Sequence, residues 1–152
     1  MVDYPAELPT PEREDYGFSH VSPFARSEMV TGRARQRRMY TSVPSMASVS
    51  FMFEKPWEAR LFEAWFREVI SDGADWFNCK LLSAVGLESY VCRFAEMYQG
   101  PMLVGNQSWR VTAILEIKER PLIEKGWATN YPQAIVNSDI IDIAANQEWP
   151  EE

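Results

Sequence analysis

The sequence has few of the residues that cross-link a chain or catalyse reactions. Its 152 residues include two cysteines, Cys79 and Cys92, and a single histidine, His20. Two cysteines exclude a framework of several disulfides and favour a reducing compartment. Both fall in neighbouring predicted strands, where we expect them as buried free thiols.

The same scarcity argues against an enzyme. A Ser–His–Asp or Cys–His centre would have to use His20, which lies in a proline-rich stretch with no local partner. Two thiols and one distant histidine cannot supply the four ligands of a closed zinc site, and no phosphate- or dinucleotide-binding glycine motif occurs. Glu63 and Glu68 lie on different sides of the polar face of the predicted helix. We therefore expect no catalytic residues, no metal and no cofactor.

Long apolar runs are also missing. None approaches the roughly 20 residues that cross a bilayer, and the N-terminus lacks the basic and apolar pattern of a signal peptide. We expect a protein with no membrane anchor, made in the cytoplasm of its host. The length and the ordinary globular composition suit one domain with terminal extensions.

Charge is unevenly distributed along a chain whose net charge is −7. This total argues against nucleic-acid binding by the whole surface. Residues 1–20 hold five acids against one base, and residues 119–152 hold seven acids against two bases. Complementary faces on neighbouring subunits are one consequence of such a distribution.

Between the acidic ends lies a basic stripe of four arginines, Arg33, Arg35, Arg37 and Arg38. Guanidinium groups at this density suit recognition of phosphates or carboxylates. The stripe is therefore predicted to contact either DNA or an acidic surface of another subunit. The negative net charge and the absence of a nucleic-acid motif favour the protein surface.

The first 30 residues are predicted to form an extended N-terminal arm. They contain four prolines and little periodicity. Such an arm is either a loose terminus or a segment laid across a neighbouring subunit. In the second case Tyr4, Tyr16 and Phe18 would anchor it.

Residues 31–121 carry the periodic patterns of a folded domain. Alternation predicts strands over 33–41, with a basic face, and over 47–53, with Val49, Phe51 and Phe53 on one side. Pro56 begins the one convincing helix, which Asp72-Gly73 ends. Its packing face is predicted to consist of six apolar residues at helical spacing: Trp57, Leu61, Phe62, Trp65, Phe66 and Val69.

Strands follow over 76–82, 90–94 and 109–117, with loops at Gly100-Pro101 and Gly105-Asn106. Strands dominate and the helix is single. This order predicts a mainly β (α+β) fold, an antiparallel β-sandwich with one flanking α-helix. Residues 122–152 are predicted to be an acidic C-terminal extension.

Segment 31–120 resembles the minor tail protein M group of long-tailed phages and the related distal tail proteins. The order of three elements carries the resemblance. They are a Gly-Ala-aromatic element after the helix, a Tyr-x-Cys strand and a closing strand that ends in Glu. In this sequence they are Asp72-Gly73-Ala74-Asp75-Trp76-Phe77, Tyr90-Val91-Cys92-Arg93-Phe94 and Trp109-Arg110-Val111-Thr112-Ala113-Ile114-Leu115-Glu116.

The resemblance implies a structural subunit of the virion tail, at the distal tail, tail tip or baseplate. Members of this kind form closed rings, commonly hexameric, and connect the tail tube to the tip or to receptor-binding components. Its partners would be copies of itself and other phage tail proteins. The alternative is a tail tube, terminator or head–tail connector subunit whose arginine face meets DNA passing through the lumen. The N-terminal arm and the acidic extension depart from the group.

Overall fold

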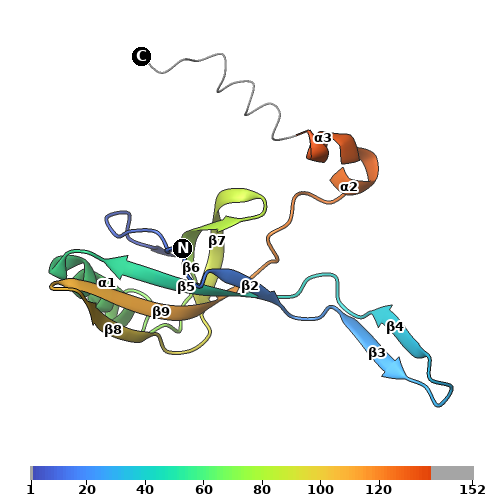
Figure 1. Cartoon of the computed structure of the whole chain (residues 1–152), viewed down its shortest axis with the longest axis horizontal. Helices are drawn as coiled ribbons and strands as arrows, with labels where there is room; N and C mark the ends of the chain where they lie inside the picture. Colours follow the sequence, from blue (N-terminus) through green and yellow to red (C-terminus); the bar gives the residue numbers. More distant parts are fainter. Residues whose placement is uncertain (1, 138–152) are drawn as a thin grey trace. The chain divides into compact units, whose positions relative to one another are not determined.

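The computed structural model describes residues 2–137. The chain divides into two compact units, Met1–Pro121 and Leu122–Glu152 (Figure 1). In the described part of the second unit, two short helices, α2 (Trp127–Asn130) and α3 (Pro132–Val136), follow one another. Residues 138–152 of the predicted acidic extension lie outside the described residues.

The first unit is built on one seven-stranded mixed sheet. Its strand order is β1-β6-β7-β9-β5-β2, and β8 also pairs with β9. The strands are β1 (Val2–Asp3), β2 (Gly17–His20), β5 (Ser45–Phe53), β6 (Phe77–Ser83), β7 (Gly86–Phe94), β8 (Gln99–Val104) and β9 (Ser108–Ile117). The mainly β, α+β class is confirmed. Two details differ from the prediction, because these strands form a single sheet and β1 runs parallel to β6.

The strand β9 is the centre of this sheet. One edge of β9 pairs with β5 along the whole strand, from Ser45 opposite Ile117 to Phe53 opposite Trp109. The other edge is shared by β8 and by the last residues of β7. Because side chains alternate along a strand, this register brings two buried rows together on one face. The rows are Ala47, Val49, Phe51 and Phe53 of β5, and Val111, Ala113, Leu115 and Ile117 of β9.

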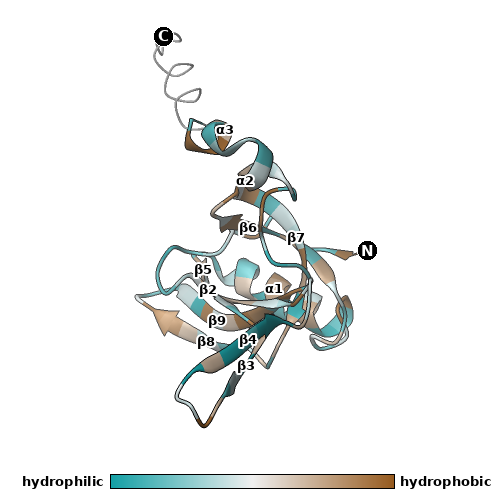
Figure 2. Ribbon diagram, turned by 90° about the vertical axis from the view of Figure 1, so that its right-hand side faces the viewer, coloured by the Kyte–Doolittle hydropathy of each residue, from teal (hydrophilic) through white to brown (hydrophobic). Residues whose placement is uncertain are grey.

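The helix α1 (Pro56–Glu68) covers this apolar face (Figure 2). Its buried residues are Ala59, Phe62, Trp65 and Phe66. The predicted packing face is therefore wrong at its margins, where Trp57 is 42% exposed and Val69 is 44% exposed. Leu61 is partly buried against the core. A 3–4 spacing marks a wide apolar stripe, but only its centre reaches the sheet.

Two glycines occupy positions that no other residue fits. Gly73, in the turn after α1, has φ +88°, and a Cβ there would lie 2.9 Å from the Phe66 ring. The helix predicted to end at Asp72-Gly73 ends earlier, at Glu68. Gly100 has φ +108°, and its Cβ would lie 2.6 Å from the Arg110 carbonyl oxygen. The loop predicted at Gly100-Pro101 is wrong. Both residues belong to β8, at an irregularity between Gln99 and Met102.

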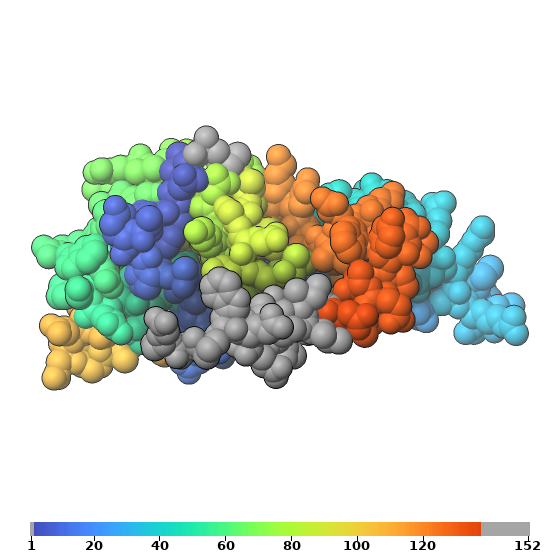
Figure 3. All heavy atoms as spheres, turned by 90° about the horizontal axis from the view of Figure 1, so that it is seen from above, coloured from blue at the N-terminus to red at the C-terminus, as the bar shows by residue number. Residues whose placement is uncertain are grey.

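The N-terminal segment, residues 2–20, closes the sheet around the core. It begins as β1 beside β6, where the Tyr4 N–H donates to the Asn78 carbonyl (2.8 Å), and it ends as β2 beside β5. Between them the Glu12 N–H donates to the Ser50 carbonyl of β5 (2.7 Å). Leu8 is buried, and Figure 3 shows the blue N-terminal residues packed against later parts of the chain. The prediction of an arm outside the core is thus wrong for these residues, because prolines limit strand pairing but not burial.

The folded protein is expected to lose stability in alkali because of two tyrosines in the N-terminal segment. Burial raises the pKa of Tyr4 well above its ordinary value and the pKa of Tyr16 to about 12, although a hydrogen bond to Leu82 lowers the latter. Unfolded tyrosine has a pKa near 10. The folded state therefore keeps these two hydroxyl protons at a higher pH than the unfolded state does. The stability that this difference contributes is complete below about pH 10 and is lost as the pH rises toward 12.

The measurement is Tm as a function of pH in thermal denaturation. The Tyr4→Phe/Tyr16→Phe double variant is expected to show a shallower fall of Tm above about pH 10 than the unaltered chain. Tyr40→Phe is the control, because Tyr40 is 60% exposed. Equal slopes for all three proteins would contradict the link between burial and the pKa of these tyrosines.

Candidate interaction surface

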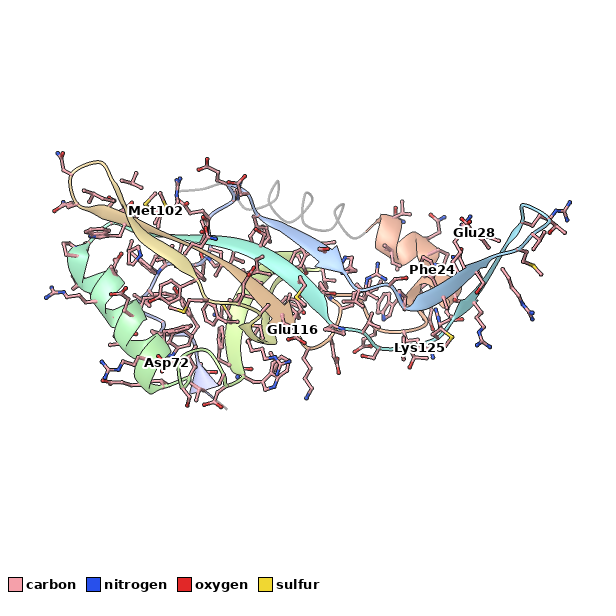
Figure 4. The ribbon with its side chains drawn as sticks, turned by 90° about the horizontal axis from the view of Figure 1, so that it is seen from below. Phe24, Glu28, Asp72, Met102, Glu116 and Lys125 are labelled. Atoms are coloured by element: carbon pink, nitrogen blue, oxygen red, sulfur yellow. The ribbon has the colours of Figure 1, made fainter. Side chains whose placement is uncertain are left out.

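A second, two-stranded sheet forms an exposed hairpin, residues 24–38. It consists of β3 (Phe24–Glu28) and β4 (Ala34–Arg38), paired antiparallel from Phe24 opposite Arg38 to Glu28 opposite Ala34. At its turn the Met29 N–H donates to the Arg33 carbonyl (3.1 Å). At its base the Met39 N–H donates to the Pro23 carbonyl (2.7 Å). The hairpin extends beyond the larger sheet, as Figure 4 shows with Phe24 and Glu28 labelled.

The arginines of the basic stripe lie on different sides of this hairpin. Arg35 and Arg37 share one face, where they border a surface hollow of about 300 Å³ over Ala25 and Ser27. Arg38 belongs to the other face, together with Arg26 of β3, and Arg33 lies in the turn. The strand predicted over 33–41 is confirmed for Ala34–Arg38. Its basic face is confirmed for Arg35 and Arg37, whereas Arg38 points to the opposite side because side chains alternate along a strand.

The hairpin carries positive charge that its own chain does not neutralise. Every residue of β3 and β4 is exposed. Within residues 2–137, none of its five arginines takes part in an ion pair. Glu12 and Glu14, acids of the predicted arm, lie 3.6 and 3.2 Å from the Arg110 guanidinium instead. The hairpin therefore offers free guanidinium groups on both faces to carboxylates or phosphates.

Apolar side chains lie at both ends of the hairpin. At the turn, Met29 is 53% exposed and Val30 is fully exposed. At the base, Phe24, Met39 and Tyr40 are between 46% and 60% exposed. Arginine, methionine and aromatic residues are the types enriched in protein interfaces. This composition predicts a surface that a partner covers.

The three residues predicted as arm contacts have partners within their own chain. The Tyr4 ring stacks on Phe51, with centroids 5.5 Å apart. The Tyr16 hydroxyl donates to the Leu82 carbonyl (2.6 Å), and its ring meets Phe18 edge to face. These contacts hold the N-terminal segment on its own domain. The predicted anchoring of this segment on a neighbouring subunit is therefore not supported, because all three side chains pack against their own core.

His20 and the two cysteines make contacts within the sheet. His20 lies in β2, where its Nδ1 is 2.8 Å from the Oγ of the buried Ser45 of β5, so this contact joins two paired strands. Cys79 and Cys92 are buried free thiols, as predicted. A hydrogen bond with Cys79, together with burial, raises the pKa of the Cys92 thiol. A raised pKa makes the Cys92 thiol a poor nucleophile.

The part of the chain from residue 2 to 137 shows neither a metal cluster nor a spanning helix. No three side chains of His, Cys, Asp or Glu there gather so as to hold a metal ion. Among the same residues, no helix combines the length and apolar character required to cross a bilayer.

Sequence reasoning missed β3, the partner of the basic strand. Residues 24–28 fell within the predicted arm, although Gly32 lies between two short polar runs, which is a signal for a hairpin. The structure thus brings Arg26 to the basic stripe and joins the end of the predicted arm to the start of the domain. No protein-family model, no curated protein and no solved structure matches this chain.

Proposed function

We propose that this chain is a non-enzymatic structural subunit of a phage tail. It assembles with copies of itself into a ring at the distal tail, tail tip or baseplate, and it connects the tail tube to the tip or to receptor-binding components. The sequence resemblance of segment 31–120 supports the phage context. The exposed β3–β4 hairpin is the observation that carries the assembly role.

The hairpin supports assembly because it buries no side chain within its own domain. A two-stranded hairpin is at best marginally stable alone in water. Packing against another subunit would cover its exposed apolar ends and order its strands. The hairpin is thus expected to be the element that reaches a neighbour.

Charge supports a second copy as that neighbour. The hairpin carries five arginines and one glutamate, a charge of +4, within a chain of net charge −7. The rest of the chain therefore carries −11, which is the total less the contribution of the hairpin. A basic projection on an acidic body attracts other copies of the same molecule.

The alternative is a tail tube, terminator or head–tail connector subunit whose arginines face DNA. Free guanidinium groups on both faces of the hairpin favour this possibility. A phosphate contact would show as DNA binding that weakens steeply with salt. Contact with a carboxylate surface would show as assembly without DNA binding.

The test replaces Arg33, Arg35, Arg37 and Arg38 by Gln. We expect oligomers to be lost in analytical ultracentrifugation, with an unchanged Tm because these side chains are exposed. The pair R35Q/R37Q and the pair R60Q/R67Q on α1 form a matched comparison, and only the first should weaken assembly. Salt-dependent DNA binding lost in the quadruple variant, with assembly intact, would favour the alternative. Unchanged assembly without DNA binding would overturn both.

A further inference from the structure

The edge strand β8 exposes an uncharged, apolar surface. It pairs on one side with β9, and no other described strand covers its second side. No charged residue occurs between Glu96 and Arg110. The exposed apolar side chains of this stretch are Met97, Met102, Leu103 and Val104, of which Met102 is labelled in Figure 4.

Such an edge is unusual in a protein that stays monomeric. Free edge strands present unpaired N–H and C=O groups to any other chain, and monomers protect them with charged residues, prolines or a covering element. Pro101 and the irregularity between Gln99 and Met102 protect the start of β8, but Met102 and Leu103 beyond them are 63% and 58% exposed. We therefore expect a partner strand to cover β8.

The strand β2 is a second uncharged edge of the same sheet. It pairs with β5 at the far end of the strand order, and no other described strand lies beside it. No Asp, Glu, Lys or Arg occurs from Tyr16 to Ala25. Gly17, Ser19 and His20 of β2 are exposed. Neither edge carries an Asp, Glu, Lys or Arg side chain, so no charges of these types repel one another across the contact.

We propose that β8 of one copy pairs with β2 of the next copy. This inference rests on the proposed function, since it names the contact through which copies assemble. Pairing between two different edges is a head-to-tail contact, the kind that generates a ring when the rotation closes. A contact of β8 with β8 would end at a dimer and would leave both β2 edges open. Head-to-tail pairing covers the β8 edge and the β2 edge of every copy in the ring.

Two double variants test this contact, each adding lysines to one edge. Met102→Lys/Leu103→Lys charges β8 at two exposed positions. Gly17→Lys/Ser19→Lys charges β2, where Ser19 is exposed and a Cβ on Gly17 would meet nothing within 4 Å. Lysines on edge strands oppose pairing between edges. Val69→Lys/Leu87→Lys is the matched control, because these apolar residues are 44% and 60% exposed outside β2 and β8.

The decisive experiment is analytical ultracentrifugation of the full-length variants, measured first alone and then as a mixture of the two edge variants. Each edge variant alone is expected to lose every species above the 17.6 kDa monomer, while the control assembles as the unaltered chain does. An equimolar mixture of the two edge variants is expected to form a 1:1 dimer, because one β2 and one β8 remain intact. A mixture that stays monomeric, edge variants that still form rings, or a β2 variant that dimerises alone would overturn the inference.

The outcomes separate this contact from the role of the hairpin. If the arginine variant stays monomeric while both edge variants assemble, the proposed function stands and the β8–β2 contact fails. If the edge variants behave as expected while the arginine variant assembles normally, the contact stands and the hairpin has another role. An unaltered chain that stays monomeric at its highest soluble concentration, in the presence of the other tail components, would overturn both.

Discussion

Deletion of residues 1–20 is expected to unfold the first unit. The N-terminal segment bridges the edges of β6 and β5, and it buries Leu8, which is 5% exposed. Burying one leucine contributes about 1.5–3 kcal/mol, and Tyr4 adds its stacked ring. A domain is stabilised by roughly 5–15 kcal/mol in total. Loss of these contacts and of two paired strands therefore removes much of that margin.

The measurement is chemical denaturation followed by circular dichroism, with a point variant beside the deletion. Leu8→Ala is expected to lower the free energy of unfolding by roughly 2–5 kcal/mol. Glu7→Ala, next to it and exposed, should stay within about 0.5 kcal/mol of the unaltered chain. A deletion variant with the same denaturation midpoint as the full chain would contradict this structural role. It would restore the prediction that residues 1–30 are an arm for a neighbour.

Phe62→Ala is expected to be the most destabilising single substitution in α1. Phe62 is fully buried, and its ring lies near six other aromatic rings. These belong to Phe51, Phe53, Trp65, Phe66, Phe94 and Tyr98, with centroids 5.2 to 6.5 Å away. Removing a buried phenylalanine ring costs about 3–5 kcal/mol, because the cavity cannot collapse fully. Denaturation with guanidinium chloride measures the loss.

Two other positions of α1 serve as controls for that loss. Trp57→Ala is expected to cost less than Phe62→Ala, although the removed side chain is larger, because Trp57 is 42% exposed. Arg60→Ala, on the exposed face, should change the free energy of unfolding by at most about 0.5 kcal/mol. A cost of Trp57→Ala equal to that of Phe62→Ala would contradict the exposed position of Trp57 and support the packing face predicted from the sequence.

Local periodicity was enough to predict the central elements of the fold. Val49, Phe51 and Phe53 alternate with more polar residues, and the same holds along most of 109–117, so the predicted strands agree with β5 and β9. Pro56 likewise marks the start of α1. These signals are local, because a strand or helix repeats its burial every two or three to four residues.

Long-range contacts were beyond the reach of such patterns. Nothing in the spacing of prolines and tyrosines shows that Tyr4 stacks on Phe51, or that Glu12 and Glu14 approach Arg110. The candidate site was predicted in part. The arginines were identified as a basic surface, but the partner strand β3, which adds Arg26 to the face of Arg38, was not.

The sequence alone determined the strands β4, β5, β6 and β9 and the start of α1, that Cys79 and Cys92 are free and buried, and where positive charge gathers. These properties depend on residue type and on neighbours a few positions away. Only the tertiary structure decided that residues 2–20 close the larger sheet and that residues 24–38 form a separate hairpin. It also decided that β2 and β8 are edges of the larger sheet. Strand order and exposure are set by contacts between residues far apart in the chain, which no local pattern encodes.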